Sequence, residues 1–112
     1  MTPGIYNIRA YRNDTLQRTV TITDGSALPI SLANATMKME VRDKPDGDVY
    51  LTLTEGDGLT VGGAGNNVVT ISKVVNIDGG CYFYDLQATF TSGVVTTYIK
   101  GSFLVTDDIT LA

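Results

Sequence analysis

The sequence of 112 residues contains no histidine and no tryptophan. Histidine is the commonest general base and the commonest metal ligand, so its absence argues against most hydrolytic and metal-centred chemistry. The single cysteine, Cys81, cannot form a disulfide within the chain, and no histidine is present to activate it as a nucleophile. No acidic pair or calcium-loop spacing stands out, and we assign no catalytic residue, cofactor or metal site.

Basic residues are few, since 8 lysines and arginines stand against 12 aspartates and glutamates, a net charge of -4. They are scattered along the chain, so we expect no nucleic-acid binding, which needs a positive surface. No apolar run approaches the ~20 residues that span a bilayer, and the N-terminus lacks the basic and apolar regions of a signal peptide. We therefore expect a protein made in the cytoplasm, neither secreted nor membrane-bound.

Threonine, valine and glycine are plentiful and glutamate is scarce, a composition that favours strands over helices. Apolar and polar residues alternate with a period of two along much of the chain, most clearly from Tyr82 to Phe90. Eight or nine such segments are separated by turn signals. This pattern predicts an all-β fold, an immunoglobulin-like antiparallel β-sandwich, as one domain over residues 1–112.

Two hairpins are predicted within this pattern. In the first, residues 37–41 and 49–53 flank the segment 44–47 (KPDG), which favours a type I turn with Gly47 free to adopt a positive φ. In the second, a turn at residues 91–93 leads to a strand that ends near Thr106. Its inward side is predicted to carry Val95, Ile99, Phe103 and Val105. Gly101 keeps the inward parity without a side chain, which indicates a bend, a bulge or a close contact.

The segment 78–84 (DGGCYFY) resembles the D-x-G-x-Y-x-C signature of immunoglobulin domains. Asp78, Gly80 and Tyr82 are in register with that signature, and Tyr84 stands where it has a cysteine. In the signature, the tyrosine hydroxyl binds to the backbone a few residues upstream. We therefore interpret Asp78, Gly80 and Tyr82 as a structural corner rather than a binding site.

Four apolar residues fall on the outward side of the last predicted hairpin: Phe83, Tyr98, Val94 and Leu104. Apolar side chains gathered on a sheet face that should contact water indicate one of two arrangements. Either a loop covers them, or they form an interface with another subunit or partner. Both alternatives are open on the sequence alone.

The order of several short motifs resembles tailed-bacteriophage β-sandwich domains, in particular the N-terminal domain of phage baseplate upper proteins. The motifs are LPISLANAT (28–36), VRDKPDG (41–47), GCYFYDL (80–86), GSFLV (101–105) and DIT (108–110). The resemblance implies a non-enzymatic virion structural protein, a tail, baseplate or fibre-attachment module. Its partners would be other virion proteins, met as a homo-oligomer or in a symmetric assembly. The alternatives are a capsid decoration or collar protein and, in another class, a carbohydrate-binding module.

Overall fold

The computed structural model describes residues 4–24, 26, 28–44 and 46–107. Within these ranges the chain forms nine strands and no helix. The described residues thus include no helix long and apolar enough to cross a membrane. The strands are β1 (Gly4–Ile5), β2 (Ile8–Tyr11), β3 (Thr15–Thr21), β4 (Ala35–Arg42), β5 (Val49–Glu55), β6 (Gly58–Gly62), β7 (Val68–Val74), β8 (Gly80–Phe90) and β9 (Val95–Thr106). The predicted all-β, immunoglobulin-like fold is confirmed. Residues 108–110 of the last motif lie outside the described ranges.

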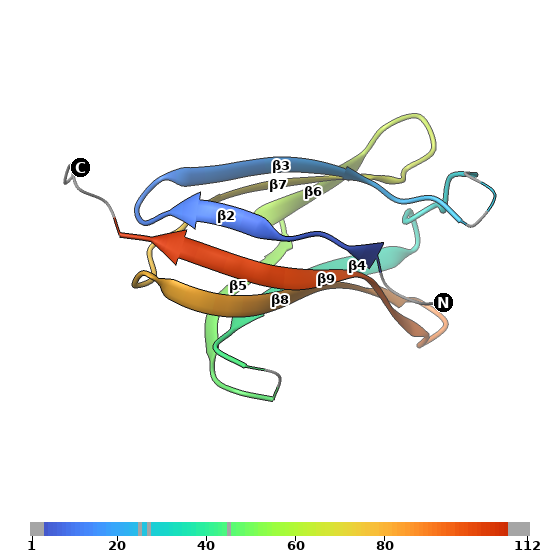
Figure 1. Cartoon of the computed structure of the whole chain (residues 1–112). Helices are drawn as coiled ribbons and strands as arrows, with labels where there is room; N and C mark the ends of the chain where they lie inside the picture. Colours follow the sequence, from blue (N-terminus) through green and yellow to red (C-terminus); the bar gives the residue numbers. More distant parts are fainter. Residues whose placement is uncertain (1–3, 25, 27, 45, 108–112) are drawn as a thin grey trace.

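The strands form one curled sheet in the order β1-β9-β8-β4-β5-β6-β7-β3, and β2 also pairs with β9. One end of the sheet is formed by β1 and β2, and the other end is β3. The curl brings these two ends towards each other (Figure 1). Most neighbours are antiparallel. However, β1 and β2 run parallel to β9, and β5 and β6 form a short parallel pair.

The core lies inside the curl and is built from the alternate residues of the long strands. In β4, Met37, Met39 and Val41 are wholly buried, as their alternation with charged residues predicted. The inward side of β8 is buried from Tyr82 to Ala88. Each large apolar side chain buried in this way contributes about 1.5–3 kcal/mol to folding.

The first predicted hairpin is present as the antiparallel pair β4–β5. Its turn closes through a hydrogen bond of 2.8 Å from the Gly47 amide to the Lys44 carbonyl. The prediction of a type I turn is wrong, because the positive φ falls on Asp46, at 62°, and not on Gly47. Glycine at 47 leaves space for the turn, since a Cβ there would lie 2.9 Å from the carbonyl oxygen of Lys44 and closer still to the Asp43 and Lys44 side chains. Pro45 lies outside the described residues.

The second hairpin, β8–β9, contains a β-bulge that reverses the side-chain pattern of β9. The register shifts between Leu86 and Gln87, and Tyr98 is the extra residue on β9. Tyr98 and Ile99 are therefore both buried, while Val95 is 57% exposed. The predictions that Tyr98 faces outward and Val95 inward are wrong, because they extended one alternation through the bulge.

Gly101 marks a close contact with the N-terminal segment. A Cβ at this position would lie 2.4 Å from the carbonyl oxygen of Tyr6 and 2.9 Å from Oδ1 of Asn7. The same carbonyl accepts a hydrogen bond from the hydroxyl of Tyr84, which lies opposite Gly101 on β8. The link between β1 and β2 therefore packs directly against β9.

Candidate functional site

The outer surface of β4, β8 and β9 combines an exposed aromatic ring with charges of both signs. Two rows of paired residues cross the three strands there. We call this surface the Phe83 face and define it by these rows, Arg42–Phe83–Ser102 and Glu40–Asp85–Lys100. Directly opposite residues on neighbouring strands have Cβ atoms about 5 Å apart, so these six side chains form one surface.

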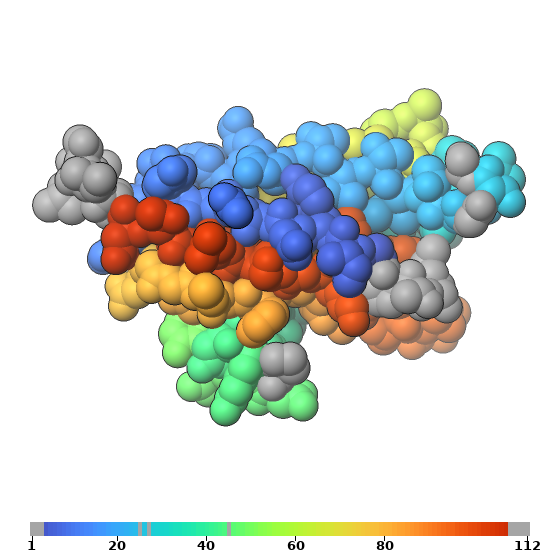
Figure 2. Space-filling view, viewed as in Figure 1, coloured from blue at the N-terminus to red at the C-terminus, as the bar shows by residue number. Residues whose placement is uncertain are grey.

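This face is hollowed around Phe83, whose side chain is 46% exposed. The hollow has a volume of about 670 Å³. Ile5, 68% exposed on β1, and Lys44 in the β4–β5 turn also line it. In Figure 2 this turn projects below β8 and β9. An exposed ring in a concave, partly charged surface is suited to binding a partner or ligand.

Arg42 organises the charged part of this face. Its guanidinium contacts the Glu40 carboxylate at 3.0 Å and donates a hydrogen bond of 2.6 Å to the carbonyl of Gly47. Nζ of Lys38 lies 3.6 Å from the other Glu40 oxygen. The hydrogen bond from Arg42, together with the charge of Lys38, lowers the pKa of Glu40 although burial opposes this. Arg42 therefore ties β4 to the turn that walls the hollow and keeps Glu40 ionised.

Asp85 has the opposite environment. Burial raises the pKa of its carboxyl, and the nearby charge of Glu40 raises it further, while Arg42 acts against both. The two carboxylates lie on paired positions of β4 and β8. A cationic group placed over them by a partner would relieve this repulsion, which favours binding of a surface that carries positive charge.

The structure separates the four residues predicted to form an interface. Phe83 lines the hollow, and Leu104 is half-buried further along β9, opposite Cys81. Val94 is exposed in the β8–β9 turn, roughly 20 Å or more from Phe83 along β8 at ~3.3 Å per residue. Tyr98 is only 8% exposed because of the bulge and cannot belong to an outward stripe. Phe83 is thus the centre of a different surface from the one predicted.

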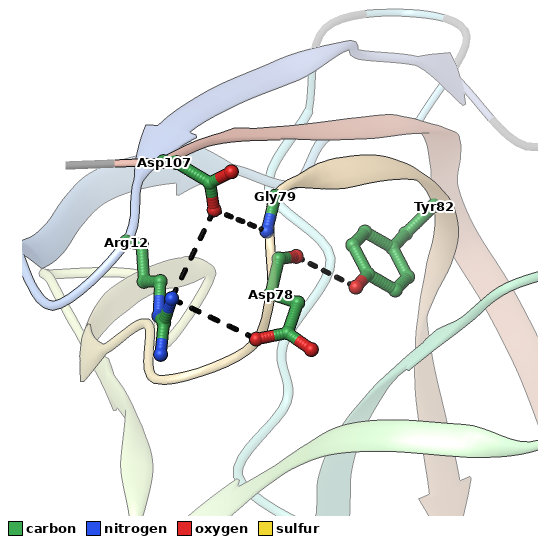
Figure 3. Close-up of polar contacts among 5 residues, drawn as sticks. All are labelled: Arg12, Asp78, Gly79, Tyr82 and Asp107. Atoms are coloured by element: carbon green, nitrogen blue, oxygen red, sulfur yellow. Dashed lines mark hydrogen bonds and ion pairs between the residues drawn. The ribbon is translucent and has the colours of Figure 1, made fainter.

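Of the residues predicted as a corner, Asp78 precedes β8, while Gly80 and Tyr82 lie at its start. Figure 3 shows Asp78 and Tyr82 with their contacts. The Tyr82 hydroxyl donates a hydrogen bond of 2.7 Å to the carbonyl of Asp78. The next residue, Gly79, donates its amide to Oδ1 of Asp107 at 2.9 Å. The Arg12 guanidinium lies 3.8 Å from the Asp78 carboxylate and 4.0 Å from that of Asp107. These contacts connect the segment that leads into β8 with the residues that follow β2 and β9.

Gly80 and Tyr50 also contact the ring of Tyr82. Gly80 opens β8, and a Cβ there would lie 3.7 Å from the Tyr82 ring, which is an ordinary contact. The ring of Tyr50 on β5 packs edge-on against that of Tyr82, with centroids 5.2 Å apart. The contacts are hydrogen bonds to backbone groups and ring packing, and the structural corner stays a prediction.

Sequence reasoning missed Ile5, Arg42 and Lys100 as members of the surface around Phe83. Alternation places Arg42 on the outward side of its strand, but it does not say which strands are neighbours. Ile5 reaches the hollow only because β1 pairs in parallel with β9, opposite Lys100. No local signal in the sequence predicts that pairing.

No group of acidic residues and cysteine in the described part of the chain could hold a metal ion. Cys81 is exposed at the start of β8. The Phe83 face offers hydrogen bonding, charge pairing and apolar contact. The strand order and the core define an all-β fold of immunoglobulin-like type.

Several solved structures have a similar arrangement of strands. A fibronectin(III)-like module of Clostridium thermocellum CbhA is 15% identical, over 96% of this chain and 92% of the module, with a TM-score of 0.47. The IG1 domain of RIG-5, solved as a homodimer, is 18% identical over 95% of this chain and 94% of that one, with a TM-score of 0.46. CopC from Methylosinus trichosporium OB3b is 13% identical over 71% and 74% of the two chains, with a TM-score of 0.43. No protein-family model and no curated protein matches the sequence.

Proposed function

We propose that this chain is a non-enzymatic structural module of a tailed-bacteriophage or prophage virion, in the tail, the baseplate or a fibre attachment. Copies of the chain associate with one another through the Phe83 face. The virion setting rests on the sequence motifs that resemble baseplate upper proteins. The choice of this contact surface rests on Phe83, whose ring is 46% exposed at the centre of a hollow on a sheet face.

The charges on this surface favour a second copy as the occupant. Glu40 and Asp85 supply negative charge, while Arg42, Lys44 and Lys100 supply positive charge, all lining the same hollow. In a two-fold contact each surface meets a copy of itself, so a surface with both signs can be self-complementary. A symmetric pairing would place a cation of one copy over the Glu40–Asp85 pair of the other.

The energy of one such contact is modest. Burying the remaining exposed part of Phe83 contributes roughly 1 kcal/mol, about half of what full burial of a large apolar side chain provides. A symmetric particle repeats the contact around an axis, so weak individual contacts become strong through multiplicity. Capsid decoration or a collar position would use the same surface at another place in the particle.

A carbohydrate-binding module is the second candidate. Phe83 is surrounded by groups that hydrogen-bond hydroxyls, among them Asp85, Arg42 and Ser102. An exposed ring beside such groups can stack on the apolar side of a sugar ring. A glycan array separates the two candidates: glycan binding that is lost in Phe83→Ala supports this one.

The virion setting is tested by quantitative mass spectrometry of phage particles purified by density gradient from the source host. The proposal predicts that the chain co-purifies with intact particles in a fixed ratio to a tail protein. Washing at high salt and comparison with a host protein of similar abundance exclude adhering contaminants. Presence of the chain in the cells and its absence from particles would contradict the proposal.

A further inference from the structure

The two ends of the curled sheet leave a groove between β1 and β3. It has a volume of about 580 Å³, and Gly4 to Tyr6 form one wall while Thr19 to Asp24 form the other. Half-buried Val20 and the buried residues Tyr98 and Ile99 line it as well. The bulge in β9 brings these last two side chains under the groove together. This groove shares only Ile5 with the lining of the hollow around Phe83.

Along the groove, the backbone of β3 has hydrogen-bonding groups without a strand to pair with. The Ile22 amide donates to the Asn67 carbonyl at 2.8 Å, on the β7 side. Since the direction of backbone groups alternates along a strand, those of Thr19 and Thr21 point away from β7, towards the groove. Within the described residues β3 pairs only with β7, and it is the last strand of the sheet.

The Arg18 side chain covers the free edge of β3 before Thr19, at the end of the groove away from Thr21. Its guanidinium donates to the carbonyl of Gln17 on β3 at 2.8 Å and to that of Arg9 on β2 at 3.3 Å. One side chain thus bridges the two edge strands where they come together in Figure 1. The open part of the β3 edge is therefore short, about five residues or roughly 17 Å of extended chain.

We propose that the groove between β1 and β3 is a strand-acceptor site, which binds a short extended segment of another protein by β-strand addition. A peptide in an extended conformation can form main-chain hydrogen bonds with the free amides and carbonyls of Thr19 and Thr21. Every second side chain of the segment is apolar, because it covers Val20 and Tyr98, and the others face water. Edge-to-edge pairing of two whole β3 strands is disfavoured, since Arg18 blocks the continuation of the edge.

A displayed library of random heptapeptides, panned against the full chain, tests this site. The proposal predicts enriched peptides with apolar residues at alternate positions and no proline between them. Synthetic versions of these peptides then bind the wild-type chain and bind Thr21→Pro about tenfold more weakly, because one backbone donor is lost. Proline is tolerated on an edge strand where the amide points away from the sheet.

Gln17→Pro is the matched control. It removes an amide of the same parity on the same strand, beyond Arg18, and should leave peptide affinity unchanged. Amide hydrogen exchange of the wild-type chain provides a readout that needs no variant: the Thr19 and Thr21 amides exchange quickly when free and slow down when peptide is bound.

Four results would overturn the proposal. They are a library without enrichment, enriched peptides without alternation, equal affinity for Thr21→Pro, and Thr19 and Thr21 amides that are already protected in a chain that sediments as a dimer. The last result would mean that a second copy occupies the edge.

Discussion

The hydroxyl of Tyr82 joins β8 to the segment that enters it, because it donates to the Asp78 carbonyl four residues upstream. Burial and the nearby Asp78 charge raise the pKa of this phenol, so the hydroxyl keeps its proton and remains a donor. The ring is buried against that of Tyr50. Ring and hydroxyl therefore make separable contributions to stability.

Tyr82→Phe keeps the ring and removes only this hydrogen bond. We expect a loss of about 1–2 kcal/mol in the free energy of unfolding, because the carbonyl loses its donor in a half-buried place. Tyr50→Phe is the matched control and should change stability by less than about 0.5 kcal/mol, since Tyr50 is exposed. Urea unfolding measures both variants. If the Tyr82 and Tyr50 variants were equally stable, the hydroxyl would have no structural role.

The N-terminal strands β1 and β2 depend on one glycine. β1 and β2 contribute only two and four residues, and both pair in parallel with β9. Between them, the chain passes so close to Gly101 that no side chain fits there. The Tyr84 hydroxyl and the Asn7 side chain hold this crossing in place.

Gly101→Ala should therefore detach or shift the N-terminal strands. A Cβ only 2.4 Å from the Tyr6 carbonyl forces the backbone apart, and we expect a loss of about 1–3 kcal/mol in unfolding free energy. Hydrogen exchange should increase for residues 4–11 before the rest of the sheet. Gly62→Ala is the control, because a Cβ there meets nothing within 4 Å. Unchanged exchange in residues 4–11 of Gly101→Ala would show that the contact has no such role.

The sequence predicted those elements whose side chains alternate without interruption. β4 from Met37 to Val41 and β8 from Tyr82 to Ala88 follow the period of two, so alternation identified the buried side of each. In β9 the same reasoning failed at Tyr98 and Val95, because a bulge depends on how two strands fit together and not on either strand alone. The parallel pairing of β1 and β2 is likewise a tertiary feature.

For the whole molecule, the same limit applies to the candidate site. Parity alone placed Phe83 outside, and Phe83 is exposed. The hollow around it is assembled from β1, β4, β8, β9 and the β4–β5 turn, so its composition depends on the curl of the sheet. Val94 was grouped with Phe83 because both face outward, although they lie at opposite ends of β8. Sequence periodicity reports which side a residue faces and not which neighbours it has.

The Phe83 face and the groove between β1 and β3 are proposed as two contact surfaces of different kinds. The first offers an aromatic ring among charges, and the second offers unpaired backbone groups. A domain with one surface for its own copies and another for a partner's extended segment can join a symmetric layer to a neighbouring component.

Sedimentation velocity of the purified chain tests the central claim, association through the Phe83 face, most directly. We expect a concentration-dependent oligomer for the wild type and a monomer for Phe83→Asp, because a buried unpaired carboxylate disfavours the contact. Val74→Asp is the matched control: its side chain is 49% exposed on β7, away from this face, and the variant should associate like the wild type. Circular dichroism verifies that both variants are folded. A wild type that stays monomeric at every concentration, or a folded Phe83→Asp variant that associates like the wild type, would contradict the account.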